Sequence, residues 1–249
     1  MKTCLKLSLS CVLALCCAGT VTGGSFVYEG FDYPALSLLN GQVGGSGFTG
    51  PWLADPGVIV QPPPGLSSSL GLPSTGLSIG GGFNAARQLA SPLSQPEYWA
   101  SFQIQAAAGN DQVFLGFDVG PSPLPLVSFG RILNTYFIRP GGGAGVQGGV
   151  ASPVGFTDLL VARFTQGGAS TAVDLWVNPT DFKLPPLLSL VVPAVAYSLA
   201  DLQVQPGFLA DEVRIGNTPF DVSAVPEPAS LELLALAVCA LLGRRRLAD

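Results

Sequence analysis

The sequence of 249 residues contains no histidine, and only 11% of its residues are charged, about half the fraction usual for a soluble domain. The lack of histidine excludes the Ser-His-Asp triad, histidine-ligated metal sites and the most common general base. With a net charge of −5 and no basic stripe, the chain is not suited to bind nucleic acid. A hydrophobic fraction of 48% excludes disorder driven by charge and low hydrophobicity.

Cysteine is absent from the middle of the chain, because all five cysteines lie near its ends: Cys4, Cys11, Cys16, Cys17 and Cys239. Residues 25–224 therefore have no disulfide framework and no thiolate metal site. The same stretch has thirteen acidic and six basic side chains, a net charge of −7. This composition is typical of an acidic bacterial envelope protein, since small eukaryotic secreted domains use disulfides far more densely.

The first 24 residues have the pattern of a secretory signal peptide. Lys2 and Lys6 precede a twelve-residue apolar run, and small residues follow it. We therefore expect a signal helix over residues 1–24, with cleavage near residue 18 or 23. Lipidation of Cys16 or Cys17 is an alternative, although neither follows the small residue expected there.

The last 25 residues, 225–249, have three parts: Pro226-Glu227-Pro228, an apolar run, and Arg244-Arg245-Arg246. The prolines separate the tail from the preceding structure, and the arginines favour the cytoplasmic side of a membrane. A helix over residues 229–243 would be about 22 Å long, against a hydrocarbon core of about 30 Å. The length suits a short transmembrane helix that anchors the protein transiently.

This tail resembles the PEP-CTERM sorting signal. The resemblance implies an exosortase, a membrane protease-transpeptidase, as the partner that processes the tail, with Glu227 as a recognition residue rather than a catalyst. The sorting motif would comprise Pro226, Glu227, Pro228, Arg244, Arg245 and Arg246. Glu232 departs from an uninterrupted apolar run, and its position near one end places it at the membrane interface. The alternative is an amphipathic C-terminal helix packed on the domain.

The remaining residues, 25–224, predict an all-β domain. Alternating, β-branched and aromatic runs recur between turn residues, without long helix-period stretches. We expect strands at 26–28, 58–60, 77–79, 98–105, 112–118, 126–129, 132–139, 145–150, 159–165, 172–177, 196–204 and 211–215. Many strands without crossover helices favour antiparallel pairing, so the predicted fold is a two-sheet jelly-roll sandwich.

Two local patterns make this prediction specific. In the strand at 98–105, alternation directs Phe102 and Ile104 to the core and Ser101, Gln103 and Gln105 outward. The segment 111–118 after Gly109-Asn110 reads as the return strand of a hairpin with it. A second hairpin is predicted from 159–165 and 171–177.

The order of motifs along the domain suggests a family. The opening is formed by 26–33, 41–48 and Gly50-Pro51-Trp52, the middle by 160–164 and 173–179, and the close by 211–216 and 220–222. Together they resemble the concanavalin-like, laminin-G-like jelly rolls of PEP-CTERM proteins in planctomycete- and verrucomicrobia-type bacteria. The resemblance covers nearly all of residues 25–222 and implies a fold and an address, but no reaction.

Carboxylates do not form a catalytic pattern in the sequence. A retaining glycosidase needs two carboxyl groups about 5–5.5 Å apart. Glu29 and Asp32 are an odd number of residues apart, so they would not share a strand face, and they suggest turn residues. Asp211 and Glu212 are adjacent and would point to opposite faces of the sheet. Either of them is therefore expected to form an ion pair with Arg214 or Arg163. Asp111 and Asp118 stand at opposite ends of one strand. We therefore expect no enzyme, although a matched carboxylate pair on one concave sheet face would favour a glycan hydrolase or lyase.

Two binding chemistries stay open. Calcium could bind at Asn110-Asp111 or at 178–181, although turns with Asn and Asp explain both segments, and no other cofactor is expected. A glycan could stack on exposed aromatic rings, although a packing role is favoured for each candidate. The candidates are Trp52, Trp99, Trp176, Tyr33, Tyr98 and Tyr136, of which Trp176 shares a face with Asp174 and is expected to be half-exposed.

The sequence as a whole predicts an exported protein that is transiently membrane-anchored through its tail and sorted by an exosortase to the cell envelope or extracellular matrix. There the jelly roll would act as a structural or binding module, with exopolysaccharide or cell-surface glycan as partner. The first alternative is a carbohydrate-active enzyme on the same fold. The second is a membrane-anchored surface protein whose tail is never processed.

Overall fold

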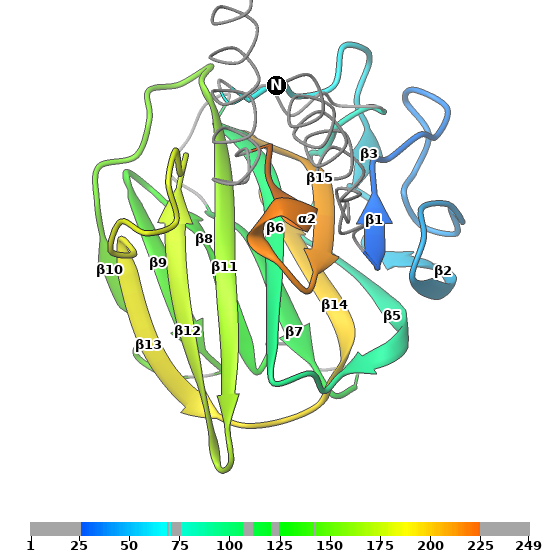
Figure 1. Ribbon diagram of the computed structural model, residues 1–249. Coiled ribbons are helices and arrows are strands. Elements are labelled where there is room, and N and C mark those ends of the chain that lie inside the picture. The colour runs from blue at the N-terminus through cyan, green and yellow to red at the C-terminus, as the bar shows by residue number, and fades with distance from the viewer. Residues whose placement is uncertain are drawn as a thin grey trace, which may run out of the picture.

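The computed structural model describes residues 26–68, 70, 76–106, 112–120, 125–141 and 143–224. These residues form fifteen strands and one short helix, α2 (Pro219–Val222). The strands make two antiparallel sheets that pack face to face (Figure 1). The prediction of an all-β, two-sheet antiparallel sandwich of jelly-roll type is confirmed.

The first sheet, sheet A, has eight strands. Their order across the sheet is β13 (Leu188–Pro193), β12 (Ser170–Val177), β11 (Thr157–Gly167), β6 (Glu97–Ala106), β15 (Phe208–Gly216), β4 (Ile79–Gly80) and β3 (Ile59–Val60), and β1 (Val27–Glu29) also pairs with β15. The hairpin of β11 and β12 has the predicted pairing, with Leu160 opposite Val177 and Phe164 opposite Val173.

The second sheet, sheet B, has seven strands and lies behind sheet A in Figure 1. Its order is β10 (Val146–Gly148), β9 (Thr135–Pro140), β8 (Val127–Ile132), β7 (Gln112–Asp118), β14 (Tyr197–Val204), β5 (Asn84–Leu93) and β2 (Phe48–Ala54). Sheet B contains β7, whereas β6 belongs to sheet A, so the predicted hairpin between 98–105 and 111–118 is wrong. These two neighbours in sequence belong to opposite sheets: β6 pairs with β11 and β15, whereas β7 pairs with β8 and β14.

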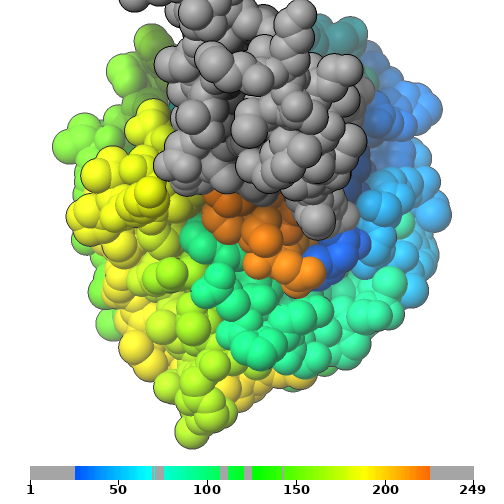
Figure 2. Space-filling view, in the orientation of Figure 1, coloured from blue at the N-terminus to red at the C-terminus, as the bar shows by residue number. Residues whose placement is uncertain are grey.

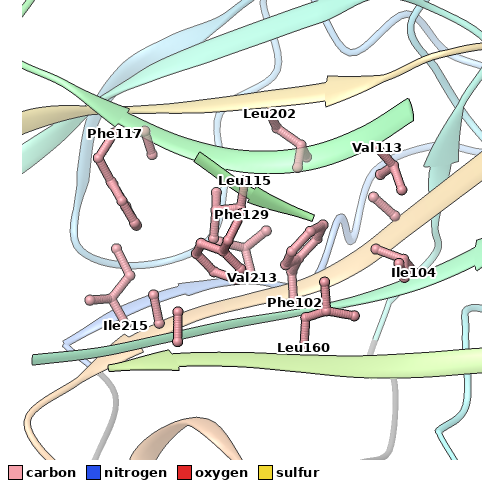
Figure 3. Packing of buried hydrophobic residues seen from close by; sticks show 14 of the residues in the cluster. Phe102, Ile104, Val113, Leu115, Phe117, Phe129, Leu160, Leu202, Val213 and Ile215 are labelled. Carbon is pink, nitrogen blue, oxygen red and sulfur yellow. The ribbon is translucent and has the colours of Figure 1, made fainter. Parts of the chain in front are cut away.

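The core is formed where the inner faces of the two sheets meet. Figure 3 shows Leu115, Phe117 and Phe129 of sheet B facing Phe102, Leu160 and Ile215 of sheet A. All of these side chains are at most 1% exposed, and Phe102 packs edge-on against Phe129 at 5.5 Å. Phe102 and Ile104 lie in the core, as the alternation of β6 predicts.

Three strands, β2, β5 and β13, were not predicted from the sequence. The strand β2 includes Gly50 and Pro51 and has a register shift against β5, so it lacks a regular alternation. The sequence of β5 contains three alanines, an asparagine and a proline, which are poor indicators of strands, and β13 follows a proline-rich stretch. All three are paired strands in the sheets: β2 with β5, β5 also with β14, and β13 with β12.

Part of the outer face of sheet A is covered rather than solvated. The helix α2 lies across it, and the carbonyl oxygen of Val222 accepts a 2.6 Å hydrogen bond from the Ser101 hydroxyl. The space-filling view shows α2, in orange, at the surface beside the strands of this sheet (Figure 2). Ser101 and Gln103 are therefore fully buried, and the expectation that they face solvent is wrong although their parity is right.

The terminal segments of the sequence analysis lie outside the described residues. These are the signal peptide at 1–24, the apolar tail helix, and the sorting motif of Pro226, Glu227, Pro228, Arg244, Arg245 and Arg246. Over the part of the chain that is described, no helix has the length and apolar character needed to cross a bilayer.

Candidate functional site

The outer face of sheet B has the groups that a binding site requires. On β7 the odd-numbered Val113, Leu115 and Phe117 point into the core, so Phe114, Gly116 and Asp118 point outward. The antiparallel register places Asp201 of β14 opposite Gly116. Asp201 and Asp118 are therefore diagonal neighbours on one face of adjacent strands.

Two adjoining hollows follow this face, and we call them together the sheet-B groove. They share Phe114 and Pro125, which form an apolar floor between them. The first hollow has a volume of about 360 Å³ and the second of about 400 Å³, both within the range of small-ligand sites. The first is lined by Asn40, Leu53, Ala54, Asp55, Asn84, Ala86, Leu199, Asp201 and Leu202, and the second by Ser128, Arg139, Pro140, Gly141, Gly143, Ala144, Gly145 and Gln147.

Asp201 is the electrostatically unusual residue of the groove. Its burial, together with the nearby charge of Asp118, raises its pKa to about 7. Its Oδ2 atom is buried and accepts no hydrogen bond from the described residues. A buried carboxyl oxygen without a partner is costly, so its presence in a hollow marks a functional candidate.

Asp118 is held differently from Asp201. Its side chain is 3% exposed and is not part of the groove lining, and its Oδ1 atom accepts a 2.6 Å hydrogen bond from the backbone N–H of Val119. Its Oδ2 atom is also buried without a hydrogen-bond partner among the described residues. Asp118 therefore acts on Asp201 through its charge, while Asp201 is the carboxyl group of this pair that reaches the hollow.

A hydrogen-bonded row of polar side chains crosses the same face. The amide nitrogen of Gln203 donates to Asn84 Oδ1 at 2.8 Å, and Gln112 in turn donates to Gln203 Oε1. Arg139 donates from Nη2 to Gln112 Oε1 at 3.3 Å. The row connects β5, β14, β7 and β9, so it holds the polar groups at both ends of the groove in place without using all of their donors.

The aromatic residues considered as glycan platforms are packed inside. None of the six is more than 8% exposed. Trp99 and Trp176 stack at 5.5 Å on the outer side of sheet A, Phe182 packs edge-on against both, and the Arg163 guanidinium lies within 6 Å of both indole rings. The favoured packing role is confirmed, whereas the half-exposed position expected for Trp176 is wrong.

Glu29 is a buried anchor rather than a turn residue. One carboxylate oxygen accepts hydrogen bonds from the Tyr33 hydroxyl at 2.7 Å, Trp52 Nε1 at 3.0 Å and Arg87 Nη1 at 2.8 Å. The other accepts from the backbone N–H of Phe31 at 2.9 Å, which is the local turn contact that the sequence suggested. Burial and Glu29 raise the pKa of Tyr33 above its ordinary value. Every contact of this carboxylate is structural.

A second buried carboxylate, Asp158, explains one calcium candidate. It accepts hydrogen bonds from the Tyr136 hydroxyl, from the Ser152 hydroxyl and from Asn178 Nδ2, and Arg131 Nη1 lies 3.8 Å away. Burial and Asp158 raise the pKa of Tyr136 to about 12. The Asn178 side chain is thus committed to protein contacts.

The calcium prediction itself stays a prediction. Across the described ranges, no three Asp or Glu side chains gather as a metal site would require. The other candidate, Asn110-Asp111, lies outside the described residues.

The remaining carboxylates include the predicted ion pair and one that was not predicted. Glu212 pairs with Arg214 at 2.7 Å, as predicted, whereas Arg163 pairs with Asp174 at 2.6 Å. Asp211 and Glu212 lie at a register shift of β15, where Glu212 has a positive φ of 53°, and both are buried. The simple alternation used to place them on opposite faces does not apply at such a bulge.

A further hollow, of about 580 Å³, lies over one end of sheet A, and the exposed Phe156 borders it. Its polar side chains largely satisfy one another: Gln105 donates to Thr157, and Asp158 and Asn178 are paired as described. The sheet-B groove differs because Asp201 has an oxygen without a partner. We therefore regard the sheet-B groove as the functional candidate.

The sequence reading missed Asp55, Asp201 and Arg139, the charged residues of the groove. One signal was present, because Asp201 alternates with core-facing Ala200 and Leu202 and must therefore point outward. Nothing in the sequence indicates that β2, β9 and β14 share one sheet.

The comparisons with known proteins find similar folds and no relatives by sequence. No protein-family model matches the chain, and no curated protein sequence does either. Among solved structures, the Trypanosoma rangeli sialidase in complex with the inhibitor DANA matches with a TM-score of 0.45 and 9% identity, over 85% of this chain and 34% of the sialidase. The VIP36 exoplasmic/lumenal domain matches with a TM-score of 0.40 and 8% identity, over 74% of this chain and 91% of that domain. The chicken liver agglutinin CG-16 matches with a TM-score of 0.36 and 10% identity, over 53% of this chain and 99% of the agglutinin. At this level of similarity, the function of the chain has to be argued from its own residues.

Proposed function

We propose that this chain is an exported bacterial protein of the cell envelope or extracellular matrix whose β-sandwich binds a glycan in the sheet-B groove. The tail directs sorting: it anchors the protein transiently in the membrane and is processed there by an exosortase. The sandwich carries the binding function and performs no catalysis.

The observation that carries the proposal is the Asp201 carboxyl group, which lines a hollow together with the apolar Phe114 and Pro125 and whose Oδ2 atom accepts no hydrogen bond from the described residues. A sugar ring has C–H groups that can pack on Phe114 and Pro125, and hydroxyl groups that can donate to Asp201. The side chains of Asn40 and Asn84 line the same hollow and provide further hydrogen-bonding groups. A glycan would therefore satisfy the polar groups that the protein leaves open.

Binding without catalysis is supported by the positions of the other two carboxylates near Asp201. Asp55 lines the same hollow, but its Oδ2 atom accepts a 3.0 Å hydrogen bond from the backbone N–H of Asn84. Hydrolysis with acid and base carboxyl groups requires that both reach the glycosidic bond or its attacking water. Asp118 is 3% exposed and lies outside the groove lining, so Asp201 would act alone from this pair.

The carbohydrate-active enzyme is the second candidate, because Asp118 and Asp201 do share one sheet face. The test is to incubate the full chain with each glycan that it binds and to measure newly formed reducing ends or unsaturated products. We expect none. Product formation that stops in Asp118→Asn would establish the enzyme.

The binding test uses calorimetry of the full chain with neutral and acidic oligosaccharides. Removing the carboxyl group in Asp201→Ala is expected to weaken glycan binding about 10-fold or more, because hydrogen bonds to ionisable groups are lost. Asp181→Ala is the matched control, since Asp181 is exposed in a loop beyond β12. Absence of binding to every oligosaccharide, or equal loss in both variants, would refute the proposal.

The sorting role of the tail is tested by determining where wild type and Glu227→Ala are located in the cell and by measuring the mass of their C-terminal ends. Processing predicts a wild-type protein that lacks the Arg244–Arg246 terminus, and a variant that retains it and stays in the membrane. An intact terminus in the wild type would instead favour the unprocessed, membrane-anchored surface protein.

A further inference from the structure

Arg139 is a cation that has no carboxylate partner among the described residues. Of the six basic side chains in the described residues, Arg87, Arg131, Arg163 and Arg214 lie within 4.0 Å of a carboxylate, whereas Arg139 and Lys183 do not. Lys183 is fully exposed in a loop, but Arg139 is partly buried in the second hollow of the groove. A partly buried guanidinium without a counter-charge is the less common arrangement and calls for a physical reason.

The guanidinium of Arg139 is oriented by its neighbours. Its central carbon lies 4.6 Å from the ring centre of the buried Phe137, and one N–H donates to Gln112. A guanidinium has five N–H donors, so most of its donors are left for a ligand or solvent. The ring contact and the hydrogen bond reduce the entropy that Arg139 would lose on binding.

Charge is distributed unevenly along the groove. The second hollow contains Arg139 with Ser128 and Gln147, and no carboxylate is among its described lining residues. The carboxylates Asp55 and Asp201 line only the first hollow. One end of the groove therefore suits an anionic group and the other suits hydroxyl donors.

The described glycines Gly141, Gly143 and Gly145 bring the protein backbone close to this end. A Cβ atom at Gly145 would lie 2.2 Å from the carbonyl oxygen of Ile138, so only glycine permits the approach. The backbone of Gly143, Ala144 and Gly145 thus forms a wall of the second hollow near Arg139.

We propose that the sheet-B groove selects acidic glycans, with Arg139 binding a carboxylate or sulfate group on one sugar while Asp201 binds hydroxyl groups of another sugar in the same glycan chain. This rests on the proposed glycan function and names its ligand class. The net charge of −7 over residues 25–224 repels polyanions in general, so the selectivity has to come from this local contact.

The test compares an oligogalacturonate with the same oligosaccharide after its carboxyl groups are reduced to alcohols, by calorimetry on the full chain. The wild type is expected to bind the charged form about 10-fold or more tightly. Arg139→Gln should remove that preference and leave affinity for the reduced form within about twofold. Arg139→Lys keeps the positive charge but loses the planar, two-pronged guanidinium, so it should keep part of the preference for the charged form.

Lys183→Gln is the matched control, because it removes the same charge far from the groove and should keep the full preference. A sulfated oligosaccharide of the same length distinguishes a general anion site from one specific for carboxylate. Equal wild-type affinity for both forms, or a preference that persists in Arg139→Gln, would overturn the acidic-glycan proposal alone. A wild type that binds neither form, nor any other oligosaccharide, would overturn the glycan function itself.

Discussion

Replacing Asp201 by asparagine should make the protein more stable at neutral and alkaline pH. The pKa of Asp201 is raised to about 7 by burial and by Asp118, so folding disfavours its ionised form. Asparagine has nearly the same shape and cannot ionise. The substitution therefore removes an electrostatic cost while leaving the packing on the outer face of sheet B unchanged.

The sign and size follow from proton linkage. In the unfolded chain an aspartate loses its proton near pH 4, whereas in the folded protein Asp201 holds it up to about pH 7. The stability associated with this proton is complete below pH 4 and is lost as the pH rises through 7. A shift of roughly 3 units at 1.36 kcal/mol each gives a loss on the order of 4 kcal/mol by pH 8, and water at the partly open hollow reduces it toward about 2.

The assay is urea unfolding of wild type and Asp201→Asn at pH 5, 6, 7 and 8. The difference in unfolding free energy between the two proteins should grow by about 1–3 kcal/mol from pH 5 to pH 8, in favour of the variant, because about one third of the effect already lies below pH 5. Asp181→Asn is the control, since Asp181 is exposed, and its difference from wild type should stay flat. Parallel pH profiles of wild type and Asp201→Asn would refute the reasoning.

Three further substitutions test the interior, each by urea unfolding at pH 7. Arg87→Met should cost about 3–5 kcal/mol, because it leaves the buried Glu29 carboxylate without its charge partner; a loss below 1 kcal/mol would contradict that ion pair. Tyr136→Phe should cost about 1–3 kcal/mol through the lost 2.8 Å hydrogen bond to Asp158. Gly47→Ala should cost at least about 2 kcal/mol, since its φ is +77° and a Cβ atom would lie 2.1 Å from the carbonyl oxygen of residue 26. An unchanged unfolding free energy in Tyr136→Phe or in Gly47→Ala would mean that the local geometry at that residue differs.

The strand pattern could be predicted wherever alternation is local and clear. Phe102 and Ile104 face the core as predicted, and the β11–β12 hairpin pairs as expected, because a short turn leaves few alternatives. The prediction that β6 and β7 form a hairpin was wrong, because local alternation does not decide which strands become neighbours. Strands in a sandwich change sheets between neighbours, and the choice depends on the whole set of partners.

The candidate site was the least predictable part. Asp201 and Arg139 belong to strands on either side of β7 and β8, and the groove exists only because sheet B aligns them. The sequence offered tryptophan and tyrosine as the only candidate stacking groups for a glycan and favoured a packing role for each, which the structure confirms, since large aromatic rings contribute most when they are buried.

The sequence by itself determined that this protein is all-β and that residues 25–224 have neither histidine nor thiol chemistry, because residue type and strand alternation are local properties. Only the tertiary structure decided that Glu29 meets Arg87 in the core, 58 residues away. It also decided that Asp201 lies with an unpartnered oxygen in a groove whose other end contains Arg139. Burial and charge at these positions come from residues distant in the chain, and sheet packing brings them together.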